Sequence, residues 1–560
     1  MSAATLAPAP APAPAHPARL RVTSGKERRF FTAALVVIVG ATALTTWITG
    51  FNPLEAVGGM PNALQFIAAD YFPPTVNNAG LLTSALIETV ALALTSTLIA
   101  AVLAFLAALI GCRAVSPIPW ASPVIRGLAT FIRNVPDLVW AVILFTAMGF
   151  GFHVGFAALT LGTFGFLVRA FIESMDEVSA DTTETLAAVG ANFPQRVMQS
   201  IVPSFTKDFI AWFLYCIEVS IRGATVVGML GGGGVGMLLN GELGLARWRP
   251  RAMGTILILA ALVIAVDLLT SYLRKKLLNP SATESVTAEH RDTVVVVRGG
   301  RIAIKKRGRD RAVHLFLISA LLLSLAAFLP IRDASWGRLF TDIPGLSLTL
   351  VELGTLDFSA WSRIWTAFLD TMGIAVLSTV YSAVLALLIA PFATRNLIRN
   401  PVSPALITSV ATLIRTVPNP VLVMMAIAPF GLGVVPGIIG MTLSSTAFFV
   451  RVFVQGYEDV PDETIEALQA TGANRMVVFM GAMLPASRSH MVAWIGMRFE
   501  MNFMGSAILG MVGAGGVGAV IREAVLGRRL GVAGVAILLV FLFAFALEQG
   551  MAKIKRTYIR

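Results

Sequence analysis

Two short polar segments with the same residue pattern interrupt an otherwise apolar chain, and each has the composition of a protein-docking helix. Glu184 lies six residues before Gly190, and Glu466 lies six residues before Gly472. Small side chains let a helix sink into a groove on a partner, and glycine permits the left-handed turn that ends a helix. A proline follows each glycine after thirteen residues, and we expect it to begin the next helix. The predicted docking residues are Glu184, Ala188, Gly190, Ala191 and Pro203, and Glu466, Ala470, Gly472, Ala473 and Pro485.

Charged and polar residues also lie inside the apolar segment that follows each docking segment. Ionisable groups at membrane depth are costly and usually face a bundle interior or a transport pathway. Glu218 and Arg222 are four residues apart, so they can pair on one helical face, and contact with an anionic substrate is the alternative. Arg133 and Arg415 are expected near the cytoplasmic end of the third span. The candidate pathway residues are Glu218, Ser220, Arg222, Arg498, Glu500, Asn502, Arg133 and Arg415.

The composition places these segments in a membrane protein. Of 560 residues, 56% are hydrophobic and only 13% are charged, which is too little charge to cover the surface of a soluble protein of this length. Runs of about 20 apolar residues, enough to cross a bilayer core, recur about six times in each half of the chain. We expect spans near 30–50, 86–110, 127–148, 156–172, 204–229, 252–272, 313–330, 367–391, 406–430, 434–454, 486–512 and 532–548.

The net charge of +12 indicates contact with anionic lipid rather than with nucleic acid. Basic residues precede the first span and follow the sixth, whereas the loop 51–80 has none, so both termini are expected in the cytoplasm. Arg247, Arg249 and Arg251 break this pattern, because the span count places them outside.

The two halves match each other at a constant shift of 282 residues, without a gap from about residue 81 to 274. Each half holds an even number of predicted spans, so the repeats are parallel, with a pathway expected between them. We predict an Ala/Pro-rich disordered cytoplasmic tail at 1–29, a first repeat at 30–274, a basic cytoplasmic linker at 275–312 and a second repeat at 313–560. Val294–Val297 has the composition of a short strand, and a nucleic-acid-binding arm is the alternative for the linker.

The docking segments resemble the "EAA" loop of ABC importer permeases, which has Glu, two small residues, Gly six residues after the Glu, and then Leu-Pro. Thr185, Leu186 and Leu468 replace the small residues, and Val202 replaces the leucine. The charged spans continue into the glycine runs 231–236 and 513–518. Together with Arg133-Asn134-Val135-Pro136 and Arg415-Thr416-Val417-Pro418, they resemble the permeases of phosphonate importers.

This resemblance implies an all-α integral membrane protein of the type I ABC importer kind, with about 12 transmembrane helices as two parallel six-helix repeats. It implies inward transport of phosphonate or related phosphorus oxyanions across the bacterial cytoplasmic (inner) membrane. The implied partners are two copies of an ABC ATPase subunit, which use ATP and Mg²⁺, one extracytoplasmic substrate-binding protein, and membrane lipid.

No cofactor, metal or nucleic acid is expected on the chain itself. The glycine runs fit G-x-G-x-x-G, but an apolar helix rather than a strand precedes them, so close helix packing or an irregular turn is expected instead. The five histidines have no metal-ligand spacing. The alternatives are an importer permease for a different small anionic solute, an ion-coupled secondary transporter and a membrane-embedded enzyme.

Overall fold

The computed structural model describes residues 25–76, 78–113, 115–135, 137–278, 295–298, 301–304, 308–398 and 400–558. The predicted tail up to residue 24, most of the linker and Pro136 lie outside these ranges. Helix α1 (Gly25–Thr49) begins before residue 30, inside the segment predicted as tail. Within the linker, β1 (Val295–Arg298) and β2 (Arg301–Ile304) pair antiparallel, at the position where the composition indicated a strand.

The helices repeat at the shift that the sequence shows, since Ala79 and Trp361 begin equivalent helices 282 residues apart. The best-matched pairs are α3 (Ala79–Gly111) with α15 (Trp361–Ala393), α5 (Asp137–Met148) with α17 (Asn419–Phe430), and α8 (Val202–Val227) with α21 (Leu484–Leu509). The other pairs are α4 (Ala121–Asn134) with α16 (Val402–Thr416), α6 (Phe152–Ala188) with α18 (Val434–Glu458), α9 (Gly234–Leu243) with α22 (Gly516–Leu526), and α10 (Arg249–Leu278) with α23 (Leu530–Tyr558).

Among the described residues, eight helices are long and apolar enough to cross a membrane, and twelve if each bent helix pair counts as one span. The third span of each half is such a pair, because α4 and α5, and likewise α16 and α17, meet at 91°. Val135 and Val417 at these bends have extended backbones, with ψ of 122° and 124°. Each valine precedes a proline in the sequence, and proline disfavours helical geometry in the residue before it. The spans expected at 127–148 and 406–430 are therefore bent helix pairs.

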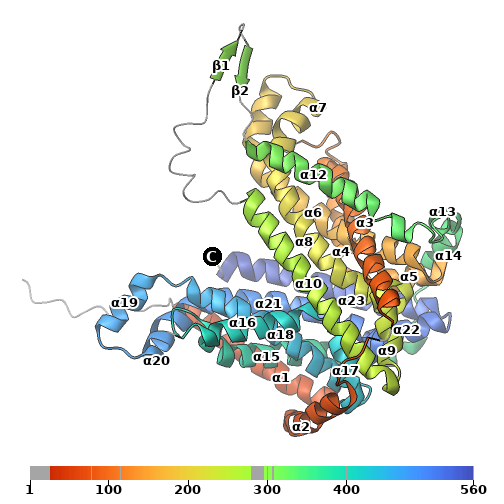
Figure 1. The fold of residues 1–560 in the computed structure, drawn as a ribbon, viewed down its shortest axis with the longest axis vertical. Coiled ribbons are helices and arrows are strands. Elements are labelled where there is room, and N and C mark those ends of the chain that lie inside the picture. Colours follow the sequence, from red (N-terminus) through yellow and green to blue (C-terminus); the bar gives the residue numbers. More distant parts are fainter. Residues whose placement is uncertain are drawn as a thin grey trace, which may run out of the picture.

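The first helix of each half packs against the other half. Helix α1 lies along α15, where Gly373 leaves room for the side chain of Thr49. Helix α12 (Gly308–Ala326) packs against α3 and α10 of the first half. Figure 1 shows the same exchange, with α1 beside α15 in one arm and α12 in the other. Residues 30–274 and 313–560 are therefore interlocked rather than separate compact units.

The ribbon has two arms that diverge from a common base (Figure 1). One arm holds α3, α4, α6 and α8, and the other holds α15, α16, α18 and α21. Within each arm the long helices approach closely through small residues such as Ala100, Ala101 and Ala104, which are fully buried. The two docking segments lie at the far tips of the arms, and α23 lies between them (Figure 1).

The arginines that broke the charge pattern hold the opposite end of the molecule together. Arg249 forms an ion pair with Asp70 at the end of α2 (Pro53–Asp70), and its guanidinium stacks 5.0 Å from the Phe66 ring centroid. The guanidinium carbons of Arg247 and Arg251 lie 5.1 and 5.7 Å from the Trp248 ring centroid. A packing role therefore accounts for these charges, because the carboxylate and the aromatic faces compensate them.

Candidate functional site: docking loops and charge clusters between the halves

Both predicted docking glycines have the left-handed backbone that their pattern indicated. Gly190 has φ of +82° and Gly472 has φ of +83°. A Cβ at either position would meet no atom within 4 Å, so only the backbone conformation requires glycine. An asparagine then caps the following helical turn: Asn192 accepts from the Gln195 N–H at 3.1 Å, and Asn474 accepts from the Val477 N–H at 2.9 Å.

The docking segments are exposed along most of their length. Glu184, Ala188 and Gly190, and their counterparts Glu466, Ala470 and Gly472, are all exposed, whereas Ala191 and Ala473 are partly buried. Large apolar side chains at the tips are exposed as well, and Val189 retains 76% of its accessible surface. Apolar groups exposed on a loop beyond the spans are typical of a surface that binds another protein. The exposed apolar set is Val189, Met198, Met476, Val477 and Met480.

The docking prolines lie in the first turn of α8 and α21, but they do not restart the chain. Five-residue π-helical turns, η1 (Val197–Ile201) and η6 (Phe479–Met483), join the preceding helical turn to each long helix without a break. Residues 193–232 consequently form one helical stretch. A π turn provides an alternative bonding pattern just where proline lacks an N–H, and the Val202 N–H accordingly bonds to the Val197 carbonyl.

The two loops differ in how they leave their spans. In the first half, α6 runs unbroken from the span to Ala188. In the second half, α18 ends at Glu458 and α19 (Asp462–Ala470) begins only after Pro461. Because proline cannot continue a helix by donating to the preceding turn, the second docking helix is a separate element.

Three of the predicted pathway residues lie inside their own half. Ser220 accepts a hydrogen bond from Thr97 at 2.9 Å, which joins α8 to α3. Asn502 donates the equivalent bond to Thr379 at 2.9 Å, which joins α21 to α15. Arg498 is buried, donates to Ser445 at 3.1 Å and lies 4.8 Å from the Phe448 ring centroid. These contacts do not favour direct contact of the three side chains with a substrate.

The other five predicted pathway residues belong to two clusters of charged side chains that include residues of both halves. In the Glu218 cluster, the Glu218 carboxylate accepts from Arg222 at 3.1 Å and from Arg415 of the second half at 3.5 Å. Arg451 interacts electrostatically with Arg415, Glu218 and Asp267. The members of the Glu218 cluster are Glu218, Arg222, Asp267, Arg415 and Arg451. The predicted pairing of Glu218 with Arg222 is confirmed.

The Glu548 cluster is the counterpart on the other side of the contact between the halves. The buried Glu548 carboxylate accepts from Arg133 at 3.1 Å, from the Asn134 amide at 2.8 Å and from Arg169. Glu500 interacts electrostatically with Arg133 and Arg169, and Arg169 also pairs with Glu173 at 2.9 Å. The members of the Glu548 cluster are Arg133, Arg169, Glu173, Glu500 and Glu548.

Sequence reasoning missed Glu548, Asp267, Arg169 and Arg451 as members of a site. A signal was present for the two arginines, since Arg169 and Arg451 are equivalent in the repeat and both lie in apolar spans. Glu548 and Asp267 are likewise ionisable residues within apolar runs, which is itself an indication of function.

Arg133 lies in the last turn of α4, at the bend of the third span. The side chain of Ile132 and the backbone of Arg133 lie against Gly165, where a Cβ would come within 3.1 Å of the Arg133 nitrogen. Gly165 is close to the middle of the span of α6, which covers Phe152–Glu177. The bend at Val135 ends α4 beside this part of α6, and the place of Arg133 near the cytoplasmic end of the span stays a prediction.

The glycine runs form irregular turns, as expected. Gly231 and Gly513 have φ of +108° and +113°, and threonines of the first long helices bind the next helix: Thr89 accepts from the Val235 N–H at 2.8 Å, and Thr371 accepts from the Val517 N–H at 2.9 Å. Gly236 also packs so closely that a Cβ would lie 1.9 Å from the Thr225 carbonyl oxygen. Since α8 rather than a strand precedes the first run, its geometry is not that of a dinucleotide site.

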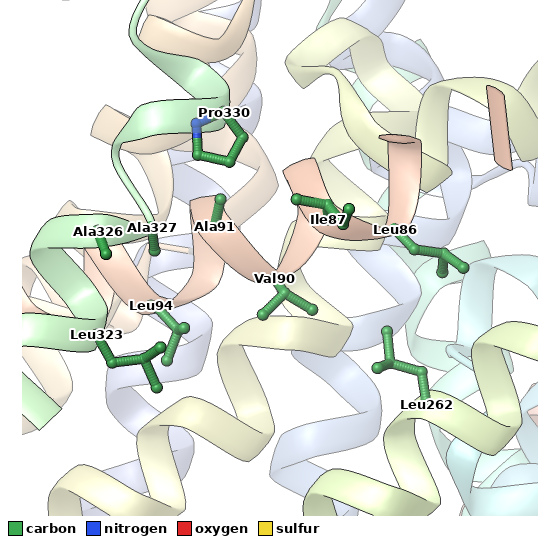
Figure 2. Close-up of a pocket in the computed structure, with 10 residues that line it drawn as sticks. All are labelled: Leu86, Ile87, Val90, Ala91, Leu94, Leu262, Leu323, Ala326, Ala327 and Pro330. Carbon is green, nitrogen blue, oxygen red and sulfur yellow. The ribbon is translucent and has the colours of Figure 1, made fainter. Parts of the chain in front are cut away.

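An apolar groove of about 370 Å³ lies between α3, α10 and α12 (Figure 2). None of the described residues that line it carries a charge to recognise an anion, which distinguishes it from the two clusters. The groove is lined by Leu86, Ile87, Val90, Ala91, Leu94, Leu262, Leu323, Ala326, Ala327 and Pro330.

Residues 100–279 and 382–552 each match the family described as "binding-protein-dependent transport system inner membrane component". The chain belongs to this family. It is 26% identical over 512 residues to the phosphate-import permease protein PhnE of Mycolicibacterium smegmatis, covering 91% of each chain. It is 30% identical over 242 residues to the phosphite transport system permease protein PtxC of Stutzerimonas stutzeri, covering 43% of this chain and 87% of that one. A glycine betaine transport permease, OpuAB of Bacillus subtilis, is 29% identical over 217 residues, covering 38% of this chain and 74% of that one.

These matches confirm the predicted class, an ABC importer permease built from two copies of the family's domain, with ATPase and substrate-binding partners. The chain is a multi-pass membrane protein and not an enzyme. The secondary-transporter and membrane-enzyme alternatives are set aside by this membership.

Proposed function

We propose that this permease moves phosphorus oxyanions (phosphonate, phosphate or phosphite) inward across the bacterial cytoplasmic membrane. Two relatives named for phosphate and phosphite support this substrate class. An arginine-rich cluster between the halves supports it as well, because guanidinium groups bind phosphorus oxyanions through paired, charge-assisted hydrogen bonds.

The observation that carries the proposed coupling is the pair of exposed docking loops at the tips of the two arms (Figure 1). One ATPase subunit would bind each loop, so one chain would serve two ATPase copies, and ATP and Mg²⁺ would bind those subunits. One extracytoplasmic binding protein would deliver the substrate at the opposite end. In this arrangement the loops and both termini face the cytoplasm, in agreement with the basic residues that precede α1 and close α10.

Uptake into proteoliposomes tests the proposal. The purified permease is reconstituted with its ATPase, the binding protein is supplied outside, and ATP with Mg²⁺ is enclosed. We expect uptake of labelled phosphate, phosphite or methylphosphonate only when all three components and ATP are present. Native mass spectrometry of the complex should give two ATPase subunits for each permease chain. Uptake in the absence of the ATPase would contradict the proposal. A complete importer that takes up none of the three anions would contradict it as well.

Another solute is the second candidate, and the similarity to a glycine betaine permease is the observation that favours it. The same vesicles distinguish the two substrates, because labelled glycine betaine carries no net charge and would not need the cluster arginines. Import of glycine betaine without import of any phosphorus oxyanion would favour this candidate.

A further inference from the structure

The two charge clusters occupy equivalent places in the repeat, and most of their members are the same. Arg133 and Arg415 are equivalent, as are Arg169 and Arg451, and as are Glu500 and Glu218. Each cluster gains a further carboxylate from the last helix of the other half: Glu548 on α23 in one, and Asp267 on α10 in the other. Two arginines facing two carboxylates are thus common to both sides.

Two further positions make the clusters unlike. Arg222 in the Glu218 cluster is replaced by Met504 at the equivalent position of the second half. Glu173, four residues after Arg169, is replaced by Gln455, four residues after Arg451. Formally, the members defined above give the Glu218 cluster three arginines and two carboxylates, and the Glu548 cluster two arginines and three carboxylates. Arg498 also interacts electrostatically with Arg415 and adds to the positive charge near the Glu218 cluster.

The bonding of the clusters differs in the same direction. Glu548 has a side chain that is 8% exposed, and two arginines and an amide all converge on it. In the Glu218 cluster the carboxylate is equally buried and also accepts one bond from each of two arginines, whose side chains are 21% and 35% exposed, but among the described residues no amide joins them. Arg169 in the Glu548 cluster has a second carboxylate partner, Glu173, where the equivalent Arg451 has Gln455 four residues on. A guanidinium has five N–H donors, so both arginines that pair with Glu218 have capacity for an incoming anion. Arg451 is exposed beside them.

We propose that the Glu218 cluster is a transient binding station for the transported oxyanion, held by Arg222, Arg415 and Arg451, and that the Glu548 cluster repels it. Glu218 keeps the arginines in place when the anion is absent, so the station does not hold three unpaired cations inside the membrane. The net negative cluster on the other side keeps the anion to one side of the pathway. This inference rests on the proposed function, because it requires an anionic substrate.

The test changes the charge of each cluster by one unit in the full importer and measures phosphate uptake into proteoliposomes. Arg222→Met and Gln455→Glu install the residues of the other half, and each lowers the net charge of the station by one unit, the first by removing a positive charge and the second by adding a negative one. At an effective dielectric constant of about 20, one unit charge about 12 Å from an anion changes its energy by about 1.4 kcal/mol, or tenfold. We therefore expect Gln455→Glu to import phosphate about tenfold more slowly, and Arg222→Met, which also loses a direct contact with the anion, to be slowed at least as much. The neutral control Gln455→Asn should stay within about twofold of the wild type, and Arg222→Lys, which keeps the charge but not the paired donors, should import faster than Arg222→Met.

Glu173→Gln, the matched change in the other cluster, should not slow uptake. Gln455→Glu is the decisive variant, because it leaves the bond between Arg222 and Glu218 intact. If Gln455→Glu takes up phosphate at the wild-type rate, the Glu218 cluster does not bind the transported anion, even if Arg222→Met is slow. Arg222 would then be only the structural partner of Glu218. A wild-type importer that moves glycine betaine but no phosphorus oxyanion would instead refute the proposed function, whatever the variants do.

Discussion

The two copies of the repeat have kept their docking loops alike and have let the charge clusters between them diverge. Both loops place a left-handed glycine, an asparagine cap and a π turn in the same order. The clusters differ at two pairs of equivalent positions: Arg222 of the first half corresponds to Met504 of the second, and Glu173 corresponds to Gln455. If two copies of one ATPase subunit bind the loops, both loops must fit the same surface. A solute that moves between the halves faces both charge clusters at once, so the two clusters need not have the same residues.

The largest expected effect comes from removing the feature that the loops share. Gly190→Val and Gly472→Val together place β-branched residues at a φ near +80°, which such residues adopt very rarely, and would displace the docking helices. We expect ATP-dependent uptake to fall by more than about 100-fold, since about 3 kcal/mol of lost docking energy corresponds to that factor.

Gly481→Ala is the control for this pair, because Gly481 lies in the π turn η6 of the same loop region, is not in the left-handed conformation and has open space around a Cβ. It should transport normally. Full uptake by the double valine variant, measured alongside binding of the ATPase to the detergent-solubilised permease, would remove the docking role of the loops.

A smaller effect is expected from the cluster that holds the halves together. Glu548→Gln removes the charge on which Arg133, Asn134 and Arg169 converge, and it leaves two arginines without their shared partner. Breaking a buried ion pair costs about 3–5 kcal/mol, and partial exposure of both arginines reduces this to about 2 kcal/mol. The melting temperature in detergent should therefore fall by several degrees.

Glu173→Gln is the matched control, because Glu173 is 63% exposed and pairs with the same Arg169. It should change the free energy of unfolding by less than about 0.5 kcal/mol. Equal melting temperatures for Glu548→Gln and Glu173→Gln would show that the buried carboxylate does not stabilise the contact between the halves.

The smallest effect on transport is expected at Arg498, although it is the most buried of the predicted pathway arginines. Its partners are Ser444, Ser445 and Phe448 of its own half. Arg498→Met keeps most of the volume and removes the hydrogen bonds, so stability should fall by about 1–2 kcal/mol. The concentration of phosphate-loaded binding protein that gives half-maximal uptake should not change. A large change in that concentration, together with normal thermal stability, would show that Arg498 contacts the substrate in the pathway.

Much of this organisation was available from the residues alone. The repeat, the number of spans, the docking glycines and the pairing of Glu218 with Arg222 are local or periodic features. They depend on hydrophobic run length, on a spacing of four residues or on the backbone preference of glycine. The family resemblance depended on the same short motifs.

The tertiary structure decided which residues share a site. Arg133, Arg169 and Glu548 are brought together from positions up to 415 residues apart, and no spacing rule predicts such a contact. The bends after Val135 and Val417 and the exchange of α1 and α12 set that geometry. The sequence determined which charges the membrane-spanning helices would carry, because composition fixes their cost in lipid. Only the packing of the two halves decided which of them would neutralise one another and which arginines would keep donors for an anion.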